Sequence, residues 1–267
     1  DFSEILGRKP FAYSEILKRT INEYFKMKNL SLDDNFFDTG ELSVQKKFIV
    51  LFGNESNNQL IGSEEEERKQ ALVTNLYFKI CELNEWIEYV EQFNNVKFVR
   101  LALSNKGTTF ESDISVNLKI LKSSFIQLKS TNPPKNNIIR KINDSPFVKE
   151  IFGDLNSVEV MSYGHSISAS EISSLQIPGI TGFSVRSNYE EQSDNYFRQL
   201  ELLKQYEEYE DGEYIIQKYH FSELKQHINI SFPIVLLFHS TNEKLKIEYE
   251  IISKDNPEKK VGLITEL

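Results

Sequence analysis

The chain has 267 residues, of which 39% are hydrophobic and 27% are charged, a composition typical of a folded globular protein rather than a disordered one. Its formal net charge of -9 disfavours broad electrostatic attraction to the phosphates of nucleic acid. The single cysteine, Cys81, excludes an intrachain disulfide and a thiolate metal cluster, and this favours a reducing cytoplasm.

Membrane-spanning and targeting signals are missing from the sequence. The longest apolar run, residues 232–238, is too short to cross a bilayer, and the amino terminus has no signal-peptide pattern. The chain begins at Asp1 without a methionine, from which we expect processing or a fragment of a longer protein. We therefore expect no membrane contact and a cytoplasmic location.

Two elements are predicted near the amino terminus. Leu17, Ile21 and Phe25 recur at helical spacing after Pro10, which predicts a short amphipathic helix. The compact apolar run at 47–52 is closed by a Gly-Asn pair and predicts a strand.

The strongest helix signal covers residues 64–93. Ser63 and Glu66 have the spacing of a capping box, and four consecutive glutamates suit the first turn of a helix. Apolar residues then step by threes and fours, which predicts a continuous apolar stripe made of Leu72, Leu76, Ile80, Leu83, Ile87 and Val90. Trp86 and Tyr89 widen this stripe, so we expect the helix to pack against a large surface, either the sandwich or a partner helix.

Residues 96–121 predict two antiparallel strands. Apolar and polar residues alternate from Ile114 to Ile120, so one face of this strand is expected to pack on a core. Asn105 and Gly107 are expected to supply left-handed turn conformations between the two strands.

The next part of the chain, residues 123–212, is harder to interpret. Tandem prolines predict a loop at 131–137, and Ser145-Pro146 predicts a short helix that ends at Gly153. Residues 157–187 remain unassigned, and Ser193-Asp194 is expected to start a further helix.

Strand patterns dominate the carboxy-terminal part. Asp211-Gly212 predicts a turn, and Pro233 predicts a kink within its strand because proline has no N–H to donate. The expected strands cover 214–219, 228–238, 245–252 and 261–265.

This succession of strands resembles an immunoglobulin-like or fibronectin-like β-sandwich accessory domain of bacterial type. The resemblance rests on Asn105, Gly107 and Thr108 between alternating apolar segments and on the final strand patterns, and it implies fold rather than activity. The fold class expected is α+β: an antiparallel Ig-like sandwich with an N-terminal helix, a long amphipathic helix and a large helix-containing insertion. The expected domains are an N-terminal helical segment, 1–45, and a sandwich domain, 46–267, with the helix at 64–93 and the insertion at 123–212.

Acidic residues near position 38 suggest two kinds of site. Phe36 to Gly40 resembles the hydrophobic-hydrophobic-Asp-Thr-Gly signature of aspartic proteases, but the sequence has no second copy, and a polar turn is the simpler interpretation. Asp33, Asp34 and Asp38 are candidate ligands of a divalent cation, although their spacing matches no calcium loop and a solvated acidic loop explains them.

The histidines offer one weak catalytic candidate. His165 lies beside a glycine and two serines, where general-base chemistry is conceivable, but the segment lacks the second glycine of a nucleophile elbow. The sequence has no phosphate-binding glycine motif, and no cofactor is predicted.

We therefore expect a non-catalytic protein-interaction or scaffolding module. Its partner is expected to be another protein or a second copy of the chain, with Trp86 and Tyr89 as anchors unless their face packs within the chain itself. Two alternatives stay open: an enzyme with a site in 123–212, and recognition of a ligand or nucleic acid by loops at one end of the sandwich.

Overall fold

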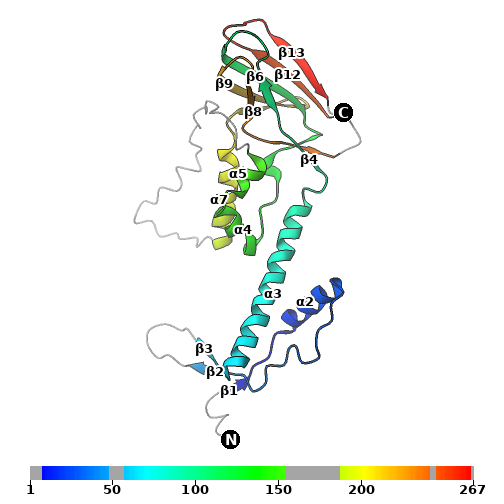
Figure 1. Cartoon of the computed structure of the whole chain (residues 1–267), viewed down its shortest axis with the longest axis vertical. Helices are drawn as coiled ribbons and strands as arrows, with labels where there is room; N and C mark the ends of the chain where they lie inside the picture. Colours follow the sequence, from blue (N-terminus) through cyan, green and yellow to red (C-terminus); the bar gives the residue numbers. More distant parts are fainter. Residues whose placement is uncertain (1–7, 48–56, 154–186, 241–244, 266–267) are drawn as a thin grey trace, which may run out of the picture. The chain divides into compact units, whose positions relative to one another are not determined.

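The computed structural model describes residues 8–47, 57–153, 187–240 and 245–265 (Figure 1). The chain divides into two compact units, Asp1–Trp86 and Ile87–Leu267, so the division falls inside a helix. The domain boundary predicted from the sequence lies instead after residue 45. No helix in the described ranges is both long enough and apolar enough to cross a membrane.

The first unit combines helices with a small antiparallel sheet whose strand order is β1-β2-β3. Its elements are β1 (Arg8–Pro10), α2 (Glu15–Met27), β2 (Ser43–Lys47), β3 (Asn57–Ile61) and the first part of α3 (Glu64–Glu91). Helix α2 confirms the predicted N-terminal helix, and Ser14 caps it by accepting the backbone N–H of Leu17 at 3.2 Å. The strand predicted at 47–52 lies outside the described residues except for Lys47, where β2 ends.

Helix α3 begins as predicted. The Ser63 hydroxyl accepts the Glu66 backbone N–H at 3.3 Å, and the Glu66 carboxylate accepts the Ser63 backbone N–H at 2.8 Å. This capping box satisfies two N–H groups that the first helical turn leaves without intrahelical partners.

The predicted apolar stripe of α3 is buried only in part within the described chain. Val73 and Ile80 are buried against Leu17 and Ile21 of α2, whereas Leu72 is 59% exposed. Other predicted stripe residues that remain exposed are Leu83, Ile87 and Val90. The reason is that α2 has only 13 residues, so it covers one side and a limited length of α3.

The second unit is built from antiparallel strands and helices, so the chain belongs to the α+β class. A five-stranded sheet has the order β13-β12-β6-β9-β8, and shorter strands pair as β4-β11-β7 and β10-β5. The strands are β4 (Val96–Val99), β5 (Ala102–Ser104), β6 (Glu111–Leu121), β7 (Phe125–Ile126), β8 (Glu207–Asp211), β9 (Tyr214–Leu224), β10 (Asn229–Ser231), β11 (Leu236–His239), β12 (Lys246–Ile252) and β13 (Lys260–Thr265).

Strand β6 forms the centre of the five-stranded sheet. Its predicted alternation is confirmed, because every second side chain is buried; these are Ile114, Val116, Leu118 and Ile120. The ring of Phe232, between β10 and β11, meets Tyr219 of β9 edge to face with ring centroids 4.7 Å apart. Tyr219 is paired with Val116, so the buried face of this sheet packs against the segment that joins β10 to β11.

The hairpin predicted at 96–121 is wrong in its pairing, although its strands exist. Strand β6 pairs with β9 and β12, whereas β5 pairs with β10. Asn105 and Gly107 do not have positive φ; the left-handed residues of this region are Asp113 and His227. The segment after Asn105 therefore leads the chain from the β5-β10 pair to the five-stranded sheet instead of turning it back.

Helices occupy much of the chain between β7 and β8. The helix predicted at 146–152 is confirmed as α5 (Phe147–Phe152), and α7 (Asn188–Leu202) begins before the predicted start at Ser193. Ser187 and Glu190 form the capping box that starts α7. Helix α4 (Asn136–Asn143) and the short 3-10 helix η1 (Leu128–Ser130) were not predicted. Figure 1 shows α4, α5 and α7 as one group of helices.

The carboxy-terminal strands follow the sequence patterns closely. The turn at Asp211-Gly212 is confirmed, with φ 58° at Gly212. The strand expected at 228–238 is divided into β10 and β11 around Pro233, as the predicted kink requires.

We expect the stability of the second unit to fall in alkaline solution because of buried tyrosines. Burial raises the pKa of Tyr89, Tyr196 and Tyr219 above the ordinary value of 10.0. Above about pH 10 the unfolded chain loses these protons while the folded chain retains them, so the free energy of unfolding decreases by about 1.4 kcal/mol per pH unit for each tyrosine. Urea unfolding at several pH values measures this slope.

The matched variants are Tyr219→Phe, which removes a buried hydroxyl, and Tyr209→Phe, which removes one from an exposed strand. In Tyr219→Phe the free energy of unfolding should fall less steeply with pH, by about 1.4 kcal/mol per pH unit. If its slope equals that of Tyr209→Phe, the Tyr219 hydroxyl does not contribute to the loss of stability in alkaline solution.

Candidate functional site

The acidic candidates of the first unit lie in a turn. The Asp33 backbone carbonyl accepts the N–H of Phe36 at 2.9 Å, and the Asp38 carboxylate accepts the N–H of Gly40 at 2.9 Å. Asp34 lies in the same turn. Within the described ranges, no group of three or more His, Cys, Asp or Glu side chains is placed to hold a metal ion.

The Asp-Thr-Gly segment closes on the start of α3. Gly40 has φ 62°, and the next backbone N–H, that of Glu41, donates to the Glu66 carboxylate at 2.7 Å. Hydrogen bonds from the backbone N–H groups of Ser63 and Glu41 lower the pKa of Glu66. The turn therefore joins the loop to the helix, and the Asp38 carboxylate is used within the turn itself.

Histidines are dispersed over the second unit. His165 lies outside the described residues, so the structure gives no geometry for it. His220 Nε2 lies 3.4 Å from Asp113 Oδ1, and these residues come from the neighbouring strands β9 and β6. His227 has a positive φ and lies in the turn before β10.

The two aromatic residues expected as partner anchors differ in their surroundings. Tyr89 is buried in the second unit, where its hydroxyl lies 3.0 Å from that of Tyr196 and its ring packs on Phe93. This corresponds to packing within the chain, which was one of the two alternatives. Trp86 is partly exposed.

The outermost strand, β13, presents an apolar edge. It ends the five-stranded sheet and pairs only with β12 among the described strands. Val261 is 68% exposed and Leu263 is 53% exposed, both on the face of the sheet turned away from the core. An edge strand with free backbone N–H and C=O groups and exposed apolar side chains is able to pair with another strand.

The opposite edge of the same sheet is different. Strand β8 has four acidic residues among its five, and these are Glu207, Glu208, Glu210 and Asp211. Lys122 pairs with Glu210 at 2.6 Å and lowers the pKa of that carboxyl group. Repulsion between carboxylates disfavours edge-to-edge pairing, so β8 is protected in a way that β13 is not.

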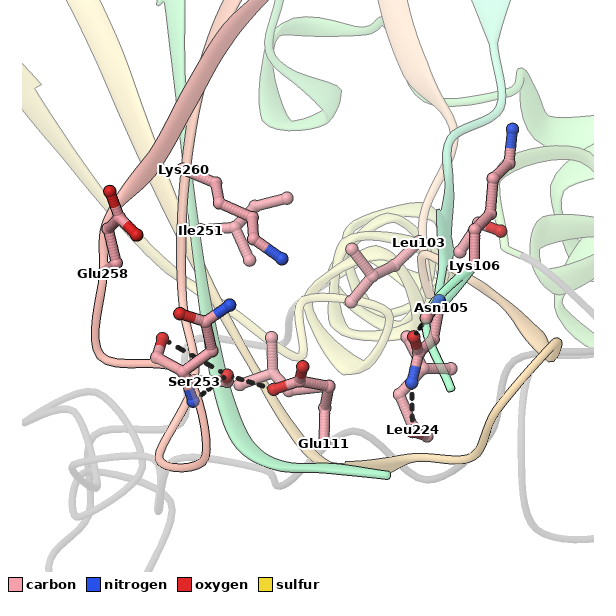
Figure 2. A pocket seen from close by; sticks show the side chains of 13 residues that line it. Leu103, Asn105, Lys106, Glu111, Leu224, Ile251, Ser253, Glu258 and Lys260 are labelled. Carbon is pink, nitrogen blue, oxygen red and sulfur yellow. Dashed lines mark hydrogen bonds between the residues drawn. The ribbon is translucent and has the colours of Figure 1, made fainter. Parts of the chain in front are cut away.

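A second feature is a cavity of about 310 Å3 at one end of the second unit, which we call the Asn105 cavity (Figure 2). Its apolar walls come from β5, β6, β9 and β12, through Leu103, Ile114, Leu224 and Ile251. The Asn105 side chain fixes the loop on one side by donating to the carbonyls of Thr109 at 2.8 Å and Leu224 at 3.1 Å. Its own carbonyl accepts the N–H of Gly107 at 2.9 Å.

Polar side chains frame the opposite side of the Asn105 cavity. The Ser253 hydroxyl donates to the Glu111 carboxylate and accepts the N–H of Asn256 at 3.1 Å. Asp255 accepts both the hydroxyl and the N–H of Ser112, at 2.6 and 2.7 Å, and these bonds lower its pKa. The turn between β12 and β13 is thereby tied to the start of β6.

Asn105 and Gly107 line the cavity but were predicted as part of a hairpin turn, and Glu111, Ser253 and Lys260, which line the same cavity, were not predicted. These three residues are distant in the sequence, and only the pairing of β6 with β12 and of β12 with β13 brings them together.

Comparison with known proteins gives no match: no family model, no curated protein and no solved structure is significantly similar to the chain.

Replacement of Gly40 by alanine tests the turn at the start of α3. A Cβ at this position meets the Glu66 carboxylate, and the positive φ strains any L side chain, so Gly40→Ala should destabilise the first unit by about 1 kcal/mol or more. Gly107→Ala is the matched control, because Gly107 lacks positive φ. Urea unfolding measures both, and equal stability of the two variants would contradict this role of Gly40.

Proposed function

We propose that the chain is a non-catalytic protein-interaction module whose second unit pairs with a second copy of itself through β13. The observation that carries the proposal is the open apolar edge formed by Val261 and Leu263. Among the described residues, the lowered pKa values belong to Glu66, Glu210 and Asp255, each in an exposed structural contact rather than in a closed cavity.

The sequence of β13 favours pairing with itself. In an antiparallel pair of two β13 strands centred on Gly262, Val261 of one copy lies directly opposite Leu263 of the other. Directly opposite side chains share a face, so two Val-Leu contacts form, each contributing about 0.2–1 kcal/mol. The Gly262 residues meet at the centre without side chains. The result would be a continuous sheet of ten strands, twice the five of one copy.

Charge also favours this edge over the others. The lysine that precedes β13, Lys259, is paired with Glu250 at 2.7 Å, and β13 itself contains a single charged residue, Lys260, which lines the Asn105 cavity. Two β8 strands, in contrast, would bring eight carboxylates together if they met. A contact of one strand pair is small, so we expect a dimer that dissociates on dilution.

The finer fold assignment is a proposal as well. We propose that the second unit is an Ig-like β-sandwich with the insertion at 123–212. Its support is the antiparallel pairing of the strands and the contacts of Phe232 with Tyr219 and Phe221, whose ring centroids lie 4.7 and 5.3 Å from that of Phe232. A bacterial origin and a cytoplasmic location are likewise proposals; the second is supported by Cys81, a free cysteine.

Light scattering across a concentration series tests the self-association. At high concentration the mass should approach twice the 31.1 kDa of the chain, and it should fall on dilution. Leu263→Lys places a charge in the centre of the proposed contact and should give a monomer at every concentration, with an unchanged melting temperature because the side chain is exposed.

The matched control is Leu202→Lys, which makes the same substitution at a leucine that is 64% exposed at the end of α7. This variant should associate like the unmodified chain. A monomer at all concentrations for the unmodified chain, or a dimer that persists in Leu263→Lys, would refute pairing through β13. Retention of the purified Leu263→Lys variant as a dimer would point to a different surface, such as the exposed side of α3.

A further inference from the structure

The Asn105 cavity contains two opposite charges that point into it. Figure 2 shows the ammonium group of Lys260, from β13, and the carboxylate of Glu111, from β6, directed toward the space between the strands. From this arrangement we propose that the cavity binds a free aliphatic amino acid in its zwitterionic form. Lys260 would receive the carboxylate of the ligand and Glu111 its ammonium group.

The charged groups retain the capacity for these contacts. The ammonium group of Lys260 forms no hydrogen bond or ion pair with another described residue, and it is directed into the cavity. One Glu111 oxygen, Oε2, accepts the Ser253 hydroxyl, which fixes the orientation of the carboxylate. The other oxygen, Oε1, forms no bond with the described part of the chain and is therefore able to accept the N–H of an ammonium group.

The remainder of the cavity suits an aliphatic side chain. Leu103, Ile114 and Leu224 are buried, and Ile251 is partly buried, so they form an apolar floor between the two charges. A volume of about 310 Å3 lies near the lower end of the range for small-molecule sites, roughly 300–1,000 Å3. The cavity therefore fits one small amphipathic molecule better than a nucleotide or a long peptide.

The charge balance of the lining selects a zwitterion over an ion of one sign. Lys106 and Glu258 lie at the rim with their charged ends directed away from the centre (Figure 2). Together with Lys260 and Glu111 they give two positive and two negative groups. The Glu111 carboxylate would repel a phosphate, and the Lys260 ammonium group would repel an amine. A zwitterion is able to place an opposite charge beside each of them.

The proposed ligand site does not depend on self-association. Side chains alternate along β13, so Lys260 is directed into the cavity whereas Val261 is directed to the outer face. The two surfaces are thus tested by different substitutions.

Isothermal titration calorimetry of the purified chain with L-leucine tests the proposal. We expect saturable binding with one site per chain. Lys260→Met keeps the length of the side chain and removes its charge, and it should weaken binding at least about tenfold, which corresponds to the loss of roughly one charged hydrogen bond. Glu111→Gln should weaken it similarly while an amide oxygen remains available to Ser253. Lys259→Met is the matched control, since Lys259 pairs with Glu250 and does not line the cavity, and it should bind as tightly as the unmodified chain.

Three further titrations separate the parts of the ligand. Isocaproate lacks the ammonium group, isopentylamine lacks the carboxylate, and glycine lacks the aliphatic side chain; each should bind at least about tenfold more weakly than L-leucine. Absence of saturable L-leucine binding to the folded chain would overturn the proposal. Equal binding by the Lys260→Met, Glu111→Gln and Lys259→Met variants would also overturn it, because the ligand would then lie elsewhere.

Discussion

The second unit depends on the burial of one side of β6. This strand lies in the middle of the five-stranded sheet, and its alternate residues from Ile114 to Ile120 are at most 2% exposed. Burial of a side chain of this size contributes about 1.5–3 kcal/mol. The period of two residues also fixes the register, because a shift by one residue would turn the whole apolar row to solvent. The neighbouring strands β9 and β12 are therefore held at defined positions, and the features at their ends follow from those positions.

The Asn105 cavity is a consequence of this register. Since Ile251 is paired with Val116, the turn after β12 arrives beside the first residues of β6, where Ser253 meets Glu111 and Asp255 meets Ser112. On the other side, the Asn105 side-chain amide donates to the carbonyls of Thr109 and Leu224 and so fixes the segment between β5 and β6 beside the end of β9. The cavity lies between these two fixed segments.

Local signals in the sequence predict much of the fold. The alternation in β6, the Ser63–Glu66 capping box and the break at Pro233 are each decided by residues within a few positions, and the structure confirms them. Pairing is decided by distant residues: the neighbours of β6 are β9 and β12, so the nearby Asn105-Gly107 segment suggested the wrong partner. Helix α7 begins directly after Ser187, because Ser187 and Glu190 form a capping box there; the sequence prediction relied instead on the later Ser193-Asp194 pair.

The candidate sites were less predictable for the same reason. Glu111 and Lys260 have no recognisable spacing in the sequence, so neither residue is distinguished there from other charged residues. They lie at one cavity because β12 pairs with both of their strands, β6 and β13. The apolar residues of β13 were predicted as a strand, but whether that strand is central or at an edge depends on the whole sheet order. The exposure of Leu72 likewise follows from the shortness of α2, which the apolar stripe of α3 does not reveal.

Both proposed surfaces include residues of strand β13. Lys260 and Val261 are adjacent in the chain but belong to opposite faces, and Gly262 allows the Tyr249 ring to pack closely where a Cβ would collide with it. A ligand held by Lys260 and a strand paired along the outer edge would each restrict the same backbone. If ligand binding changes the affinity of strand pairing by some factor, strand pairing must change the affinity for the ligand by the same factor, because one coupling free energy links the two equilibria. The alternation of side chains along a single strand is thus sufficient to keep the two proposed binding surfaces on opposite faces of the sheet.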